Sequence, residues 1–164
     1  MKNGFTLLEL MVVVLLTSVV MAALFMVLSS GQSTWFEADT QVTVQQELRK
    51  ALRAMKRDLA MSGAGASKIN VSADGSSVQF HISQGATADG VVNWSSTPIN
   101  FSVASGQLLR TEGASTAVLA NNVGPLSFTR DSSRMLNITI TVSKTTKANR
   151  NISVTHEESI YLRN

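Results

Sequence analysis

The sequence predicts an α+β fold in which one long N-terminal helix packs on an antiparallel β-sheet. Between Phe5 and Met61 the chain has no proline and a single glycine, Gly31, and its later apolar residues recur every three or four positions. That spacing is the period of an amphipathic helix. Beyond Lys68 the pattern changes to short alternating segments separated by glycine- and serine-containing turns, which is typical of antiparallel strands.

The first half of the predicted helix is apolar enough to cross a membrane. The run from Leu10 to Leu28 approaches the roughly 20 residues that a bilayer-spanning helix needs, and we expect residues 5–29 to form the transmembrane segment. Lys2 precedes the run, whereas Glu37 and Asp39 follow it. This charge bias favours a cytoplasmic N-terminus and a C-terminal domain outside the cytoplasm, in the periplasm of a bacterium.

A polar patch follows the apolar run. Ser29–Thr34 contains Gly31, and we expect it to be the weak point of the helix, where a bend can form. Trp35 and Phe36 come next. These aromatic residues suit an anchor at the membrane interface, and they equally suit a contact with the folded domain or with a neighbouring subunit.

Residues 30–62 form the amphipathic half of the predicted helix. Six apolar side chains spaced by three and four predict a stripe that packs on a core: Val44, Leu48, Ala51, Leu52, Met55 and Leu59. Five cations alternate with this stripe and are predicted to form a solvated helix face: Arg49, Lys50, Arg53, Lys56 and Arg57. We expect the helix to end near Ser62–Gly65, because paired glycines supply a left-handed cap.

Residues 63–164 are predicted to form one globular antiparallel β domain. The first strands make a hairpin, Lys68–Ser72 and Ser77–Ile82, around a turn at 73–76, with Val78, Phe80 and Ile82 on one face. Five more strands are expected at Ile99–Val103, Gln107–Thr111, Leu126–Arg130, Leu136–Ser143 and Ile152–Leu162. The chain has no cysteine, so stability must come from packing rather than from disulfides.

The sequence gives little support for catalysis, a cofactor or a metal site, and we predict none of them. The only histidines are His81 and His156. His81 alternates with apolar residues and is expected on the outward face of a strand. His156 lies beside Glu157 and Glu158, but two distant histidines without a metal-binding spacing are a weak signal. No nucleophile elbow or phosphate-binding glycine loop is present.

Glu9 is the most informative single residue. It is a carboxylate at the mouth of the apolar run, and an ionisable group inside a membrane segment is costly unless it is paired or neutralised. One interpretation is therefore a functional site. The other is an N-terminal helix acid at the headgroup level, where the helix dipole favours negative charge.

The sequence around Glu9 favours the functional interpretation. Gly4-Phe5-Thr6-Leu7-Leu8-Glu9 resembles the processing site of type IV pilins and of the pseudopilins of type II secretion. The resemblance implies that residues 1–4 are a leader peptide, that prepilin peptidase cleaves between Gly4 and Phe5, and that the same enzyme N-methylates Phe5. It also implies a pilin-type fold and an inner-membrane location before assembly into a filament.

The resemblance gives Glu9 a role in subunit assembly. In a filament, the carboxylate of one subunit would lie beside the Phe5 amine of its neighbour and fix the register of the two helices. The implied partners are other major and minor pilins or pseudopilins, the prepilin peptidase, an inner-membrane assembly platform and its ATPase.

Further features favour a minor subunit. Residues 48–65 and the closing segment 159–164 are similar to minor pilins and J-type minor pseudopilins, and the chain lacks the membrane proline, the cysteine pair and the acidic calcium loop of many major subunits. We therefore expect a minor pilin or pseudopilin that initiates or caps a filament. The alternative is a competence-type subunit for DNA uptake, with nucleic acid as a partner. Its only support is the helix cations together with Arg130, Arg134, Lys144, Lys147 and Arg150.

Overall fold

The computed structural model describes residues 6–63, 68–131 and 134–162, and the chain divides into two compact units, residues 1–39 and 40–164. One α-helix of 53 residues, α1 (Leu7–Leu59), begins in the first unit and ends in the second. It is uninterrupted through the expected weak point at 29–34, where the Ser33 and Thr34 hydroxyls donate hydrogen bonds to the Ser30 carbonyl. The α+β prediction is confirmed, with the helix packed on antiparallel strands.

The helix ends earlier than predicted, and the glycine cap is not used. The last helical residue is Leu59, and Ser62 already forms an isolated antiparallel bridge with Ile82. The Ser62 hydroxyl donates a 2.7 Å hydrogen bond to the Leu59 carbonyl, which satisfies one of the terminal acceptors. Gly63 does not have a positive φ angle, so it is not a left-handed cap, and Gly65 lies outside the described residues.

The second unit contains a five-stranded antiparallel sheet with the strand order β1-β2-β5-β6-β7. Its strands are β1 (Ile69–Val71), β2 (Val78–Phe80), β5 (Ile99–Ala104), β6 (Gln107–Glu112) and β7 (Ser115–Asn121). The predicted first hairpin is confirmed, with Ile69 opposite Phe80, and Gly75 provides the positive φ of 73° in its turn. Val78 and Phe80 are buried together as expected, whereas Ile82 lies beyond the end of β2 and is half-buried.

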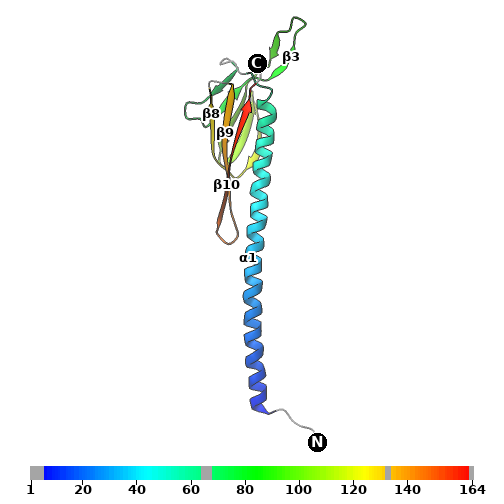
Figure 1. The fold of residues 1–164 in the computed structure, drawn as a ribbon, viewed down its shortest axis with the longest axis vertical. Coiled ribbons are helices and arrows are strands. Elements are labelled where there is room, and N and C mark those ends of the chain that lie inside the picture. Colours follow the sequence, from blue (N-terminus) through cyan, green and yellow to red (C-terminus); the bar gives the residue numbers. More distant parts are fainter. Residues whose placement is uncertain (1–5, 64–67, 132–133, 163–164) are drawn as a thin grey trace. The chain divides into compact units, whose positions relative to one another are not determined.

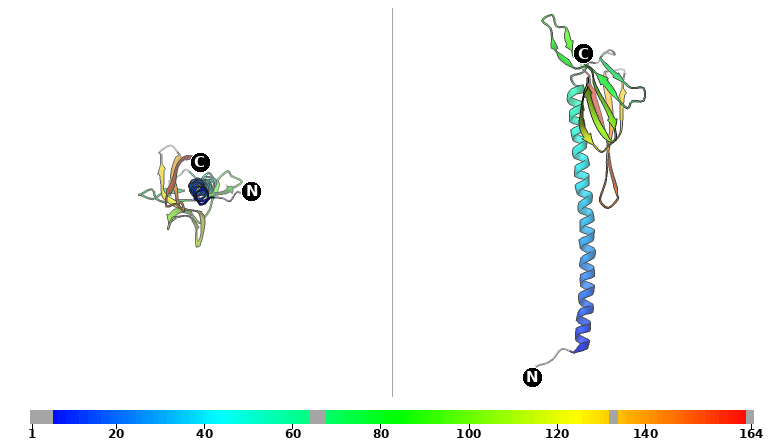
Figure 2. Two further views of the ribbon diagram at one scale, coloured as in Figure 1. Left: turned by 90° about the horizontal axis from the view of Figure 1, so that it is seen from below. Right: turned by 180° about the vertical axis from the view of Figure 1, so that it is seen from behind.

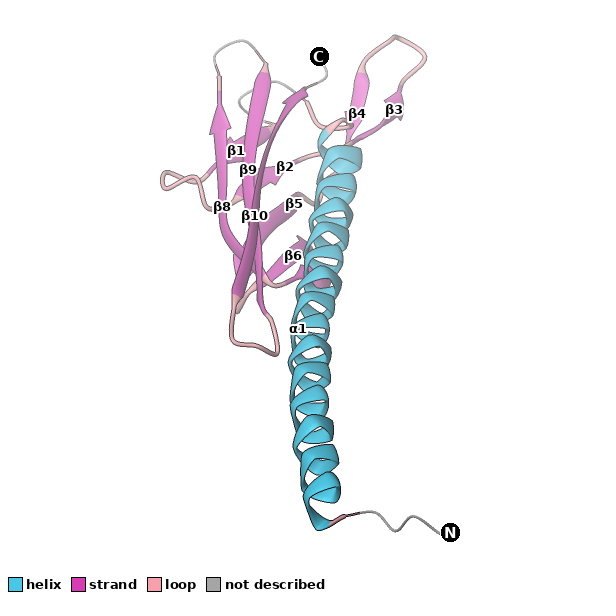
Figure 3. Ribbon diagram, turned by 60° about the horizontal axis from the view of Figure 1, so that its bottom comes forward, coloured by secondary structure: helices cyan, strands magenta, loops and turns pink. Residues whose placement is uncertain are grey.

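A second sheet has three strands in the order β10-β9-β8, and a separate two-stranded ribbon pairs β3 with β4. The strands of these sheets are β8 (Val123–Arg130), β9 (Met135–Thr145), β10 (Asn151–Tyr161), β3 (Ser83–Ala86) and β4 (Val92–Trp94). In Figure 3, β8, β9 and β10 form one group of strands, apart from β1, β2, β5 and β6. Figure 2, seen from behind, shows the β3–β4 ribbon projecting from the larger sheets.

The prediction of a single sheet was therefore wrong. The two larger sheets meet through isolated backbone hydrogen bonds, from the Phe128 N–H to the Gly75 carbonyl at 2.7 Å and from the Val123 N–H to the Gly106 carbonyl at 2.9 Å. Strands β3, β4 and β7 were not predicted. The first four residues of β7 are exposed, as is most of β3, so neither segment shows the apolar alternation of a half-buried strand.

The core of the second unit lies between the later part of α1 and the inward faces of both larger sheets. Figure 1 shows helical residues from about 40 onward running alongside the strands. Val44, Ala51, Met55 and Leu59 are at most 1% exposed, which confirms the predicted stripe, while Leu52 is partly buried against it. Phe80 and Phe101 contribute a tilted aromatic pair with ring centroids 5.3 Å apart.

Side-chain contacts join α1 to three different strands, two of them through ion pairs and one through a hydrogen bond. Asp58 is only 2% exposed and accepts hydrogen bonds from Arg110 Nε on β6 at 2.7 Å and from Arg57 Nε at 3.0 Å. Lys56 Nζ pairs with Glu158 on β10 at 2.7 Å. Asp58 comes three residues after Met55, which places it on the buried side of the helix.

Glu47 makes the third connection, because its Oε2 accepts a 2.9 Å hydrogen bond from the Asn121 N–H at the end of β7. Lys50 Nζ lies 2.9 Å from the other carboxylate oxygen. Burial acts to raise the pKa of Glu47, but the Asn121 amide and the Lys50 ammonium outweigh it and lower the pKa below its ordinary value. The charged carboxylate is thus the form that the fold favours.

We predict that Gly63→Ala destabilises the second unit. A Cβ at this position would lie 2.5 Å from Cη2 of Trp94, a rigid side chain that cannot move without disturbing the base of the β3–β4 ribbon. The expected loss is about 1–3 kcal/mol in the free energy of unfolding, measured by urea denaturation of the full chain in detergent. Gly124→Ala is the control, because its new Cβ meets only ordinary contacts from 3.5 Å. Equal losses in both variants would contradict this explanation.

Asp58→Ala is expected to cost about 3 kcal/mol, because it leaves the partly buried Arg110 guanidinium without its main partner. The same urea titration measures the change. Lys50→Ala serves as the exposed comparison, with a loss below about 0.5 kcal/mol. A small loss for Asp58→Ala would show that water replaces the carboxylate at no cost.

The lowered pKa of Glu47 predicts a pH effect of definite sign. The stabilisation is fully present above the unfolded-state pKa of 4.5 and is lost as pH falls through the lower folded-state value. Wild type should therefore lose more stability than Glu47→Gln between neutral pH and pH 3, by less than about 1 kcal/mol because the site is partly solvated. Parallel urea titrations of the two proteins measure the difference. Identical pH profiles would refute the assignment.

Candidate functional site

Glu9 lies in the first turn of α1, in a well-formed helix start. Thr6 immediately precedes the helix, its carbonyl accepts the Leu10 N–H at 3.2 Å, and its hydroxyl oxygen Oγ1 accepts the Glu9 N–H at 3.3 Å. This is the backbone half of a capping box, in which a threonine and a glutamate three residues later define a helix N-terminus. The carboxylate also lies at the positive end of the helix dipole. The structure therefore agrees with the interpretation of Glu9 as an acidic residue in the first turn of a helix.

That local role leaves the Glu9 side chain exposed. The sequence analysis did not single out Thr6, although the spacing Thr6-Leu7-Leu8-Glu9 is a recognisable capping signal. Gly4 and Phe5, the predicted cleavage and methylation residues, lie before the first described residue.

The helix around Glu9 presents apolar side chains on every side. Between Leu7 and Leu28, the large hydrophobic side chains are 48–78% exposed. By length and composition, α1 contains a segment able to cross a membrane. An exposed apolar surface of this size is covered by lipid or by other helices in a working protein. Trp35, just beyond it, is 73% exposed.

The two hydroxyl side chains between Leu7 and Leu28, those of Thr17 and Ser18, form hydrogen bonds within the helix. The Thr17 hydroxyl donates to the Val13 carbonyl at 2.8 Å, and the Ser18 hydroxyl donates to the Leu15 carbonyl at 2.7 Å. Such back-bonding lets a hydroxyl enter an apolar environment without an outside partner. Glu9 is the only ionisable residue from Thr6 to Gly31. It is therefore the group in this segment that gains most from a partner of opposite charge.

The two histidines have structural contacts. His81 is half-buried, and its Nδ1 lies 2.7 Å from the Ser95 carbonyl oxygen, so it links the end of β2 to the base of the β3–β4 ribbon. His81 was predicted to lie on the outward face of a strand, and that prediction did not include its contact with the Ser95 carbonyl. His156 Nε2 lies 3.5 Å from Glu158, whose carboxylate already pairs with Lys56. Within the described ranges, no three His, Cys, Asp or Glu residues gather in a metal-binding arrangement.

The predicted solvated face of α1 is confirmed, since all five of its cations are exposed. Three of them have carboxylate partners: Lys50 with Glu47, Lys56 with Glu158 and Arg57 with Asp58. These pairs reduce the positive potential that five unpaired cations would produce on this face. The cluster is therefore a weaker anionic-ligand site than its composition indicates.

Comparison with known families supports the functional role of the N-terminus. Residues 1–25 match the model of the prokaryotic N-terminal methylation motif. Comparison with curated proteins finds no match. The motif and the helix-on-sheet architecture are typical of type IV pilin-like subunits, a class of structural proteins that prepilin peptidase processes and that an apolar N-terminal helix anchors.

Proposed function

We propose that this protein is a minor pilin or pseudopilin, a filament subunit that initiates or caps a type IV pilus or a type II secretion pseudopilus. The observation that carries the proposal is the methylation motif in residues 1–25 on a helix whose exposed apolar surface contains one carboxylate, Glu9. A subunit of this kind does no chemistry itself. Its function is to assemble, so its important residues are those that control processing and helix packing.

The proposal divides the chain by role. Residues 1–4 are a leader on the cytoplasmic side, residues 5–29 span the inner membrane, residues 30–62 are the amphipathic half of the helix, and residues 63–164 form the periplasmic domain. Cleavage between Gly4 and Phe5 leaves the apolar helix on the mature protein and creates a new amine at Phe5. Methylation of that amine keeps it basic, so it remains a cation at the start of the helix.

Glu9 is proposed to pair with the Phe5 amine of a neighbouring subunit. Burying either charge alone among apolar helices costs several kcal/mol, and pairing offsets much of that cost. The surrounding apolar side chains attract neighbours without fixing an axial position, because their packing is similar at several offsets. One buried ion pair therefore specifies the register. Thr6 supports this role by fixing the helix start, and hence the direction of Glu9, through its capping bond.

The proposed partners follow from assembly. They are sibling major and minor subunits, the prepilin peptidase and the inner-membrane assembly platform. The absence of a membrane proline and of cysteine supports the minor-subunit role. We do not propose the DNA-uptake alternative, because its helix cations are partly committed to carboxylates of the same chain.

The central test replaces Glu9 by alanine in the native host. The variant should be processed normally, with an intact mass and N-terminal sequence that begin at methylated Phe5, because the cut precedes the helix. It should fail to co-purify with sheared filaments or with cross-linked sibling subunits, with a loss of at least about tenfold if pairing is worth about 1.4 kcal/mol or more.

Glu37→Ala is the matched control, since it removes a carboxylate from the same helix outside the apolar run. It should be processed and should assemble like wild type. Normal assembly of Glu9→Ala would refute the register mechanism. A wild-type chain that still begins at Met1, or that is cut after Leu28, would refute the pilin proposal as a whole.

A further inference from the structure

The outer face of the five-stranded sheet carries a row of side-chain amides in direct register. Asn70 on β1 lies opposite Gln79 on β2, and Gln79 lies opposite Asn100 on β5. Their sequence neighbours Ile69, Val78 and Phe101 point into the core, so alternation directs the three amides outward. With strands spaced about 4.8 Å apart, the row extends roughly 10 Å across the sheet.

These three amides have no hydrogen-bond partner among the described residues, although they lie side by side. Some outward amides elsewhere in the domain are paired. Gln107 Nε2 donates to Asn121 Oδ1 at 2.9 Å, and the Asn137 side-chain oxygen accepts from Ser159 at 2.7 Å. Each unpaired amide offers a carbonyl acceptor and two N–H donors. The row thus presents a concentrated set of uncommitted donors and acceptors.

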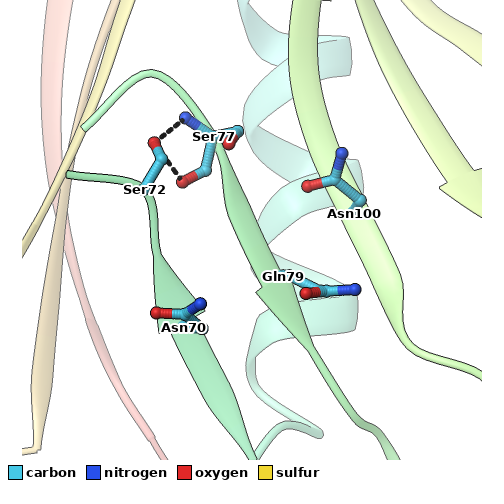
Figure 4. Close-up of a pocket in the computed structure, with 5 residues that line it drawn as sticks. All are labelled: Asn70, Ser72, Ser77, Gln79 and Asn100. Carbon is cyan, nitrogen blue, oxygen red and sulfur yellow. Dashed lines mark hydrogen bonds between the residues drawn. The ribbon is translucent and has the colours of Figure 1, made fainter. Parts of the chain in front are cut away.

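A hollow of about 300 Å³ lies over this row, and Asn70, Ser72, Ser77, Gln79 and Asn100 line it. Figure 4 shows the three amides along adjacent strands, with the two serines beyond them at the β1–β2 turn. The Ser72 hydroxyl donates to the Ser77 carbonyl at 3.1 Å and accepts the Ser77 N–H at 2.9 Å. The serines therefore form a fixed wall, and the amides remain available for a ligand.

The strand positions around the amide row carry uncharged side chains, whereas Asp74 in the β1–β2 turn, beside Ser72, is a charged carboxylate. In the described strands of this sheet, the outward positions beside the amide row carry no ionisable side chain: Ser102, Ala104, Gln107, Leu109, Thr111, Thr116, Val118 and Asn121. The charged residue Arg110 points inward instead, to Asp58. Ionisable residues usually make up a large share of an exposed protein surface. The strand surface beside the row thus offers no charge to an ionic ligand, and the Asp74 carboxylate at its end disfavours an anionic one.

We infer that this hollow binds an uncharged glycan chain through Asn70, Gln79 and Asn100. Each sugar hydroxyl is both a donor and an acceptor, which matches the amide groups, and a neutral sugar brings no charge that needs a partner at the three amides. A row of three amides across adjacent strands is long enough to contact consecutive sugar rings. The inference does not depend on filament assembly, because the site lies wholly within the second unit.

An extended peptide fits this face less well. Peptides that recognise sheets add to an edge strand through main-chain hydrogen bonds, and they place side chains in apolar pockets. The main-chain groups of β2 are already paired with β1 and β5. The hollow lies on the face of the sheet over β1, β2 and β5, and its lining residues are all asparagine, glutamine or serine.

The test titrates the full chain in detergent with a hexamer of β-1,4-linked N-acetylglucosamine, with cellohexaose and with a neutral glycine-serine hexapeptide, by calorimetry. We expect saturable binding of at least one oligosaccharide and none of the peptide. Gln79→Ala and Asn100→Ala should each weaken binding about tenfold, the loss expected for one or two hydrogen bonds to a neutral group. Gln107→Ala, a matched change outside the hollow, should bind like wild type.

Circular dichroism melting of each variant checks that the domain stays folded. If Gln79→Ala lowers the melting temperature, Asn70→Ala provides a second reading at the other end of the row. The inference is overturned if neither oligosaccharide binds, if the peptide alone binds, or if folded variants of the amide row bind as tightly as wild type.

Discussion

The structure depends on the burial of one face of α1. From Val44 to Leu59, the stripe supplies a third wall to a core that the two larger sheets leave open, and removing it would expose the inward faces of both. Hydrophobic burial is not directional, so the stripe alone cannot fix how far the helix slides along the sheets. The contacts of Glu47, Lys56 and Asp58 with three different strands supply that position.

The domain separates its charged and uncharged polar groups by location. Ion pairs lie where α1 meets the strands, and the Asp58–Arg110 pair is the most buried of them. The outer face of the five-stranded sheet instead carries amides and hydroxyls. Charges positioned between elements can fix orientation because their partners are specific. The amides of that outer face are the groups that we propose to contact a neutral ligand.

The same helix serves two environments with different physical rules. After Thr40, its apolar residues are covered by the domain, and its cations face water. In the first unit, its apolar side chains are exposed, and the hydroxyls of Thr17 and Ser18 are satisfied by the helix itself. An ionised carboxylate such as Glu9 cannot donate to helix carbonyls as these hydroxyls do, because it has no proton to give. This difference makes Glu9 the position that controls assembly in the proposed function.

Local patterns in the sequence predict the helix, its apolar stripe, most strands of the larger sheets and the N-terminal motif, because each depends on local periodicity or on a contiguous run of residues. Tertiary structure decided the division into separate sheets and the pairing of Asp58 with Arg110, which join segments 52 residues apart. Tertiary structure also explains why position 63 is a glycine: a side chain there would collide with Trp94, and Gly63 does not serve as a helix cap. The row of Asn70, Gln79 and Asn100 depends on strand order and register, which local patterns do not encode.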